Sequence, residues 1–249
     1  MPKFAANLSM LFTELPFAAR FDAAAAAGFA AVEFLFPYDD PAAEVAAWAR
    51  GAGVEIVLFN LPPGDWAAGE RGVTALRGRN ANFADGVARA LDYAAVLGVP
   101  RLHAMAGIGG DRATYVANLR SGAAACGAAG VDLLIEPISR GAMPGYFLYD
   151  FNVARAVVAE VGAANLRIQA DLFHLDSEGG DVVAQLTAGL ADIGHVQVAA
   201  PGTRHEPDTP ACAAWFAALD ALGYPGWVGA EYRPRGATVD GIGWHDRWR

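Results

Sequence analysis

Cysteine is scarce in this chain, which excludes a fold held together by disulfide bonds. Only Cys126 and Cys212 occur among 249 residues, and each lies in an alanine-rich stretch typical of a helix. Small disulfide-stabilised domains need a much denser cysteine framework. We therefore expect both thiols to be reduced and buried, where cysteine packs as a small apolar side chain.

Positive charge is also in deficit. The chain has 18 Lys and Arg against 27 Asp and Glu, which gives a formal net charge of -9 and a pI of about 4.9. A protein that binds a phosphate backbone needs the opposite balance. We expect no nucleic-acid partner.

Long apolar runs are absent as well. No run reaches the roughly 18 residues that a membrane-spanning helix needs. The N-terminal sequence MPKFAANLSM lacks the uninterrupted apolar core of a signal peptide. We expect a cytoplasmic protein with no membrane partner.

What the chain has instead is a regular alternation of two kinds of segment. Eight apolar runs have the composition of buried strands, at residues 3–8, 31–36, 54–60, 101–106, 131–138, 166–172, 193–199 and 226–232. Alanine-rich segments with the composition of helices separate them, at residues 17–27, 41–51, 80–97, 112–129, 149–161, 180–191 and 209–222. Alanine is the best helix former, so these segments need no special explanation.

This alternation predicts an α/β fold with a parallel sheet covered by helices. Eight strands favour closure into a (β/α)8 TIM barrel, which typically needs about 250 residues. An open doubly wound sheet is the alternative, but the first strand is followed by Asn7-Leu8-Ser9-Met10, which has no phosphate-binding glycine pattern. No linker or shift of composition divides the chain, so residues 1–249 are expected to form one TIM-barrel domain.

Four oxygen-bearing side chains stand where the last four predicted strands give way to loops. Glu136 follows the run LLI, Asp171 follows LRIQA, Gln197 lies in IGHVQVAA, and Glu231 follows WVGA. Four unrelated polar caps would also explain them, but catalytic residues of barrel enzymes come from several strand ends. We predict one site that binds Mg2+ or Mn2+, because hard oxygen donors suit these ions and a cation keeps crowded carboxylates ionised.

Two cationic residues and one histidine lie close to these strand ends in the sequence. His174 follows Asp171 by three residues, so both could face one pocket, although a histidine in a loop is more often a hydrogen-bonding fixture. Arg204 follows the seventh predicted strand and Arg233 the eighth. Either arginine could neutralise an anionic substrate, although exposed arginine is the commoner case.

Three further polar residues lie inside apolar strands. Glu33 is a lone acid in AVEFLF, so it must be paired or face the pocket. His103 and His195 are either partners of the site or satisfied interior histidines, and we favour the interior interpretation. Glu33 and His103 stay candidates for substrate contact.

One loop is much longer than the others. Residues 60–79 read NLPPGDWAAGERGVTALRGR, with Trp66 between glycines and no clear apolar period. Long irregular loops in compact domains are usually functional lids or disordered. We predict a lid that places Trp66 over a small polar ligand, with a solvated excursion as the alternative.

Several motifs resemble those of the hydroxypyruvate isomerase family, a branch of the xylose-isomerase-like barrels. They are NLSMLFTELPF, GFAAVEFLFPYD, NLPPGDWAAGERG, LLIEPI with its following PGY, IQADLFH, GHVQVA and GWVGAEY, and together they cover nearly the whole chain. The resemblance implies that Glu136, Asp171, Gln197 and Glu231 bind a divalent metal, with Glu136 and Glu231 also acting as acid and base. It also favours contact between His174 and the substrate.

The chain departs from the family pattern at three places. The family often has His at the position of Phe59 and at that of Arg140. The loop after Gln197 usually begins with Asp-Asn and contains His-Arg-Gly-Glu-Pro-Gly, whereas residues 200–208 here read APGTRHEPD. The proposed metal ligands are intact, so these changes affect the expected substrate more than the expected reaction class.

The resemblance implies an aldose-ketose type isomerase that interconverts hydroxypyruvate and tartronate semialdehyde through a metal-stabilised enediolate. Isomerisation of a four-carbon 2-oxo-tetronate is the close alternative, and a ketose 3-epimerase or a non-catalytic binder is less favoured. An endonuclease would need clustered zinc-binding histidines and a basic face, which five histidines and a charge of -9 do not offer. A homo-oligomer is possible.

Overall fold

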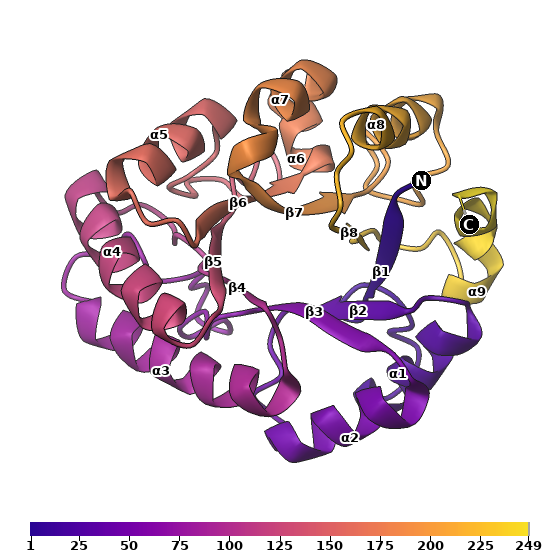
Figure 1. The fold of residues 1–249 in the computed structure, drawn as a ribbon, viewed down its shortest axis with the longest axis horizontal. Coiled ribbons are helices and arrows are strands. Elements are labelled where there is room, and N and C mark those ends of the chain that lie inside the picture. The colour runs from indigo at the N-terminus through magenta and orange to yellow at the C-terminus, as the bar shows by residue number, and fades with distance from the viewer. Residues whose placement is uncertain (249) are drawn as a thin grey trace.

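The protein is a closed barrel of eight parallel strands surrounded by helices, as the sequence predicts (Figure 1). The structure, a computed structural model, describes residues 1–248. Each strand pairs with the next in chain order, and β8 pairs with β1 to close the ring. The strands are β1 Lys3–Asn7, β2 Ala31–Phe34, β3 Glu55–Asn60, β4 Arg101–His103, β5 Asp132–Ile135, β6 Leu166–Asp171, β7 Ile193–Val198 and β8 Trp227–Ala230.

The helices form the outer ring of the barrel (Figure 1). They are α1 Phe17–Ala26, α2 Ala42–Ala52, α3 Asn80–Leu97, α4 Arg112–Ala128, α5 Phe151–Val161, α6 Leu172–Ser177, α7 Val182–Gly189, α8 Pro210–Ala221 and α9 Thr238–Gly241, with 3-10 turns η1 Leu190–Asp192 and η2 Ile242–Trp248. All seven helices expected from composition are present. Within residues 1–248, no helix combines the length and the apolar character that crossing a bilayer requires.

The structure differs from the prediction at several element ends, such as β4, which ends at His103 rather than at residue 106, and in two additional short helices, α6 and α9. Two of these differences have a clear physical reason. Strand β5 ends at Ile135, earlier than the apolar run suggests, because Pro137 has no N–H to donate to a neighbouring strand. Helix α6 was not expected, and it begins directly after β6 because the Asp171 carboxylate accepts a hydrogen bond from Phe173 N at 3.0 Å. Asp171 thus ends a strand and caps a helix.

The interior of the barrel is apolar at one end and polar at the other. Successive inward-facing residues of a strand are two apart, so Ala5 is followed by Asn7 on β1 and Ala31 by Glu33 on β2. Leu134 on β5 belongs to the same small apolar cluster as Ala5 and Ala31. The polar layer above this cluster is where the candidate site begins.

Both cysteines are buried and free, as predicted. Burial raises the pKa of the Cys126 thiol to about 11, so this sulfur stays protonated near neutral pH. The two thiols therefore contribute to packing between helices and barrel.

Gly229 on β8 tests how tightly the polar layer is packed. A Cβ atom at this position would lie 2.5 Å from Cδ of Glu33 and closer still to both carboxylate oxygens. Because Glu33 is fixed by hydrogen bonds, Gly229→Ala should lower the free energy of unfolding by about 1–3 kcal/mol. Urea denaturation measures the change.

Gly51 in α2 provides the matched control. A Cβ atom there would meet no heavy atom within 4 Å, so Gly51→Ala should be neutral or stabilise the fold by up to about 1 kcal/mol. Equal unfolding free energies for the two variants would contradict the packing argument.

Candidate active site

The four residues predicted at strand ends all lie at the C-terminal edge of the barrel. Glu136 is the first residue after β5, Asp171 the last of β6, Gln197 the fifth of the six residues of β7, and Glu231 the first after β8. All four side chains are buried. Parallel strands bring their C-terminal ends to one face, which is where barrel enzymes carry their active sites.

A cavity of about 210 Å³ opens among these strand ends. It is lined by Met10, Leu35, Asn60, Trp66, His103, Met105, Glu136, Ile138, Ala142, Met143, Gln169, His174, Arg204, Glu231 and Arg233. Asp171 and Gln197 are hydrogen-bonded to two of the lining side chains, Arg204 and Gln169 respectively. The predicted candidates Glu136, Glu231, His174, Arg204, Trp66 and His103 therefore share one cavity.

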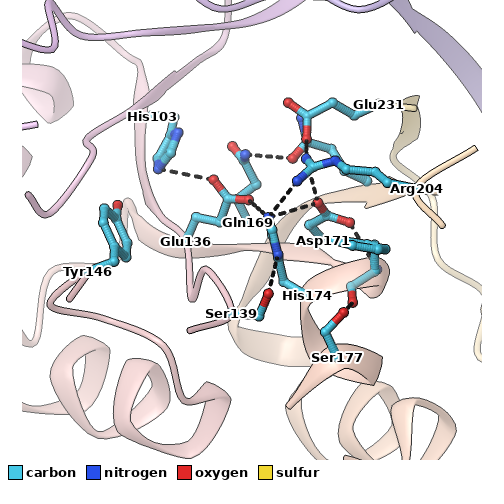
Figure 2. Close-up of polar contacts among 12 residues, drawn as sticks. His103, Glu136, Ser139, Tyr146, Gln169, Asp171, His174, Ser177, Arg204 and Glu231 are labelled. Carbon is cyan, nitrogen blue, oxygen red and sulfur yellow. Dashed lines mark hydrogen bonds and ion pairs between the residues drawn. The ribbon is translucent and has the colours of Figure 1, made fainter. Parts of the chain in front are cut away.

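Arg204 lies between two of the predicted carboxylates (Figure 2). Its Nη2 donates to Oε2 of Glu231 at 2.5 Å and to Oδ2 of Asp171 at 3.3 Å. Arg204 has a φ of +57°, a conformation that costs energy in a non-glycine residue. The loop after β7 thus holds a strained backbone that directs a cation into a group of acids.

His174 is also part of this group. Its Nε2 lies 3.4 Å from Oδ2 of Asp171 and 3.8 Å from Oε1 of Glu136. One potential ligand atom from each of Glu136, Asp171 and His174 lies within 4.8 Å of the others. This geometric cluster shares two residues with the predicted metal set and adds a histidine that we predicted as a substrate contact.

The hydrogen bonds of His174 define its tautomer. Arg204 Nη1 lies 3.2 Å from His174 Nε2, and a guanidinium can only donate, so Nε2 accepts. The proton is therefore on Nδ1, which donates to Oγ of Ser139 at 3.0 Å. Burial lowers the pKa of His174 to about 4, against the opposing effect of Asp171. The imidazole is thus neutral near pH 7.

Burial and like charges act on the two glutamates. Burial raises the pKa of Glu231 to about 8, although the charge of Arg204 opposes the shift. The pKa of Glu136 is raised well above its ordinary value by burial and then by the charges of Glu231 and Asp171. Carboxyl groups crowded in this way need a cation or a proton among them.

Gln197 is held in one orientation by Glu33. Its Nε2 donates to Oε1 of Glu33 at 2.6 Å, so the amide oxygen is turned the other way and accepts from Gln169 Nε2 at 2.6 Å. Asn7 Nδ2 also donates to Glu33 Oε1 at 2.9 Å, and His195 Nε2 lies 2.5 Å from Glu33 Oε2. Glu33 is therefore paired within the barrel, and it does not line the cavity. A direct contact between Glu33 and substrate stays a prediction.

These residues fit a divalent cation. Oxygen atoms of Asp171 and Glu231 already flank one positive atom, Nη2 of Arg204, and Glu136 adjoins Asp171 in the same cluster. The amide oxygen of Gln197 has a second lone pair beyond the one that Gln169 occupies. Carboxylate and amide oxygens are the donors that Mg2+ and Mn2+ prefer. The assignment of these four as metal ligands stays a prediction.

His103 lies beside Glu136. Its Nε2 is 3.6 Å from Oε2 of Glu136, and neither ring nitrogen has a hydrogen-bond partner among the described residues. Burial lowers the pKa of His103 to about 3, so the ring is neutral. His195 is the interior histidine that we expected, paired with Glu33, whereas His103 borders the cavity.

Trp66 lies at the cavity, as the lid hypothesis requires. Its ring packs against Phe36 with centroids 5.2 Å apart, and the Arg71 guanidinium lies 3.9 Å from its centre. The base of the loop is fixed, because Thr74 Oγ1 donates to Met105 O at 2.8 Å and Gly72 pairs with the segment after β4. The tip is held by contacts within the loop and by the packing of Trp66 against Phe36. Opening and closing of the loop stays a prediction.

Two departures from the family pattern lie outside the cavity. Phe59 is fully buried and packs with Phe34 and Tyr38. Arg140 forms an ion pair with Glu178 at 2.8 Å. Neither residue lines the cavity.

Gln169 is a polar residue of the cavity lining that was not predicted from the sequence. It is buried, and its Oε1 has no hydrogen-bond partner among the described residues. A signal was present, because Gln169 precedes Asp171 by two residues on β6 and inward-facing residues alternate along a strand. The apolar lining residues, such as Met10 and Met143, come from loops and carry no comparable signal.

Comparison with known proteins places this fold and site in a family. The model of the xylose isomerase-like TIM barrel family matches residues 21–248. The chain is 51% identical to 2-oxo-tetronate isomerase of Cupriavidus necator, over 98% of this chain and 97% of the relative. It is 40% identical to hydroxypyruvate isomerase of Escherichia coli K12, over the whole length of both.

Solved structures agree on the architecture. A crystal structure named as an AP endonuclease, family 2, from Brucella melitensis has a TM-score of 0.97 and 44% identity, with both chains covered completely. A 3-keto-D-glucoside 4-epimerase from Escherichia coli, at 20% identity and a TM-score of 0.79, shares the fold alone, and 99% of each chain is covered. The resemblance seen in the sequence motifs is confirmed. The chain belongs to the xylose isomerase-like TIM barrel family, and the two curated relatives described above are named as isomerases.

Proposed function

We propose that the protein is an aldose-ketose type isomerase that acts on a small hydroxy-oxo acid, with hydroxypyruvate and 2-hydroxy-3-oxopropanoate as the substrate pair. The observation that carries the proposal is the presence of two buried glutamates, Glu136 and Glu231, in one small cavity. They come from β5 and β8, with β6 and β7 between them on the barrel. They can therefore approach a ligand from different sides.

The reaction requires two proton transfers at carbon. Hydroxypyruvate has its ketone at carbon 2 and its hydroxyl at carbon 3, so one proton must leave carbon 3 and one must be added to carbon 2. We assign Glu136 and Glu231 jointly as the base and the acid. A Mg2+ or Mn2+ ion held by Glu136, Asp171, Gln197 and Glu231 would supply the positive charge that polarises the carbonyl and stabilises an enediolate.

The other polar side chains orient the reactants. Neutral His174 is fixed by Ser139 and Arg204 and faces the carboxylates. A substrate hydroxyl can donate to its Nε2 only by replacing Arg204 there, because this nitrogen has one lone pair. Arg204 restrains Asp171 and Glu231 and can donate to a substrate oxygen from the same position. Trp66 excludes water above the cavity, which would protect an enediolate from protonation by solvent.

A four-carbon 2-oxo-tetronate is the second candidate substrate. The curated relative at 51% identity is named 2-oxo-tetronate isomerase, whereas the relative named hydroxypyruvate isomerase is 40% identical. The proton transfers are the same for both acids, so the site chemistry described above serves either. Incubating the protein with each acid and following the carbonyl shift by NMR would identify the preferred substrate.

The same assay tests the reaction class and the metal. We expect turnover of at least one of the two acids with Mg2+ or Mn2+, loss of activity after chelation with EDTA, and recovery when the ion is added back. Binding of the acid without exchange of its carbon-bound hydrogen for deuterium would contradict isomerisation and show a non-catalytic binder. Cleavage of abasic DNA instead would favour the endonuclease activity for which the Brucella protein is named, against which the net charge of -9 argues.

Replacement of either glutamate by glutamine should separate proton transfer from binding. Glu136→Gln and Glu231→Gln each keep an oxygen donor but remove the proton carrier, so kcat should fall roughly 100- to 10,000-fold. Metal affinity should fall much less than in Glu231→Ala. Steady-state kinetics and metal titration measure the two effects.

Glu160 offers a control for this pair. It lies at the surface in an ion pair with Arg112, so Glu160→Gln should leave kcat unchanged. Near-normal turnover in both active-site variants would show that the protons travel by another route.

Removal of the Trp66 ring should affect catalysis but not folding. The side chain is 39% exposed, so Trp66→Ala should keep the thermal midpoint close to that of the native protein. We expect KM to rise and kcat to fall, together lowering kcat/KM by up to roughly 100-fold. Trp227→Ala at the start of β8, the opposite mouth of the barrel, is the control and should leave both constants unchanged. Equal kinetics in the two variants would remove the case for a lid.

A further inference from the structure

One arginine at the cavity, Arg233, has a side chain that forms no ion pair or hydrogen bond with the described residues. Its lining includes two arginines, Arg204 and Arg233, and two histidines, His103 and His174. Each histidine is directed at a carboxylate of the site, His103 Nε2 at Oε2 of Glu136 (3.6 Å) and His174 Nε2 at Oδ2 of Asp171 (3.4 Å). A guanidinium keeps its charge at any physiological pH, so among the described residues that line the cavity the two arginines are the permanent cations.

Both terminal nitrogens of Arg204 are held by the protein. One terminal nitrogen donates to Asp171 and Glu231 and the other to His174. The guanidinium also lies 5.0 Å from the centre of the Phe173 ring. Pulling it away to bind a ligand would leave two buried carboxylates without their partner, a loss that a single ligand contact would hardly offset.

Arg233 is the opposite case. Its backbone is fixed, because its N–H donates to Arg204 O at 2.7 Å and its carbonyl accepts from His205 Nδ1 at 2.8 Å. Its side chain is exposed, and no side chain within residues 1–248 forms an ion pair or hydrogen bond with its guanidinium. The structure thus places a positioned residue with free donors at the edge of the cavity.

The charges around the cavity show what this cation could balance. When ionised, Glu136, Asp171 and Glu231 contribute three negative charges and Glu33 beneath them a fourth, whereas Arg204 contributes one positive charge. A divalent ion would neutralise two of the remaining three. The carboxylate of a bound acid then adds one negative charge, which needs one more cation close by.

We propose that Arg233 binds the carboxylate of the substrate and selects acids over neutral ketoses. A guanidinium matches a carboxylate through two parallel hydrogen bonds, which suits recognition of this group. The sequence left this contact open to either arginine; the assignment gives it to Arg233 and leaves Arg204 to hold the acids in place. This inference rests on the proposed function, because it requires the substrate to be an acid.

Kinetics of Arg233 variants test the proposal. Arg233→Met should raise the KM for the acid about 10- to 100-fold, because a charge-assisted contact is lost, while kcat stays within about threefold. Arg233→Lys should recover part of the affinity, since it keeps the charge but loses the paired hydrogen bonds. Mn2+ affinity in the absence of substrate should be the same in all three proteins, because Arg233 contacts none of the predicted ligands.

Arg235 provides the matched control two residues further along. Its side chain is 53% exposed, forms two hydrogen bonds with Asp208, both at 3.1 Å, and lies 3.4 Å from Oε2 of Glu206. Arg235→Met removes the same charge from the same segment without touching the cavity lining, so the KM should not change. A rise in KM equal to that of Arg233→Met would show a long-range charge effect and overturn the proposal.

The outcomes also distinguish this inference from the proposed function. If the native protein turns over one of the acids but Arg233→Met keeps its KM, the carboxylate contact is wrong and the isomerase assignment stands. If the native protein turns over neither acid, the isomerase assignment fails, and calorimetric titration of the acids into native and Arg233→Met protein still tests the contact. Equal affinity of the two proteins in that titration would overturn it.

Discussion

The structure depends on keeping three carboxyl groups together in a small buried space. Glu136, Asp171 and Glu231 are all largely shielded from water, where like charges repel strongly and ionisation is costly. Arg204 offsets part of the repulsion, because its Nη2 forms ion pairs with both Asp171 and Glu231. The loop that carries Arg204 accepts a strained backbone at this residue, which is understandable if the cation must reach a fixed point above the strand ends. Burial still raises the pKa of Glu231 to about 8, so the charge of Arg204 alone does not balance the three carboxylates. Further positive charge close to them would be stabilising.

A second layer of the barrel controls the direction of the donor atoms. Glu33 is hydrogen-bonded to Gln197, Asn7 and His195, and Gly229 leaves the space that its carboxylate fills. Because an amide has one donor end and one acceptor end, the bond to Glu33 determines which end of Gln197 faces the site. Residues beneath a metal site commonly orient its ligands in this way. Glu33 would be unfavourable in its apolar strand if it had no partners. The barrel brings Asn7, His195 and Gln197 to it, and these side chains pair with its carboxylate.

The sequence predicts the framework better than the details of the cavity, for a physical reason. Alternation of apolar and alanine-rich segments determines the barrel, and the barrel places every strand end on one face. The positions of Glu136, Asp171 and Glu231 at one edge of the barrel could therefore be predicted without coordinates. Helix α6 could not, because it is short and depends on the capping of its first turn by Asp171. Gln169 was missed since it lies inside a strand, and the different situations of Arg204 and Arg233 depend on side-chain contacts between segments distant in sequence.

The same distinction explains why the reaction class is better supported than the substrate. The carboxylates occupy strand ends, whose positions follow from the hydrogen-bonded register of the barrel. The substrate carboxylate must be recognised at the rim, which is built by loops. The loop after β7 is where the chain departs most from the family pattern. Its turn is closed by Arg204 N, which donates to Ala200 O at 3.0 Å. Arg204 O in turn accepts a hydrogen bond from Arg233 N. A change in the residues between Ala200 and Arg204 would move Arg204 and, through it, Arg233, while the strands keep the acidic residues in place. Differences between relatives in this loop should therefore alter which acid binds before they alter the reaction.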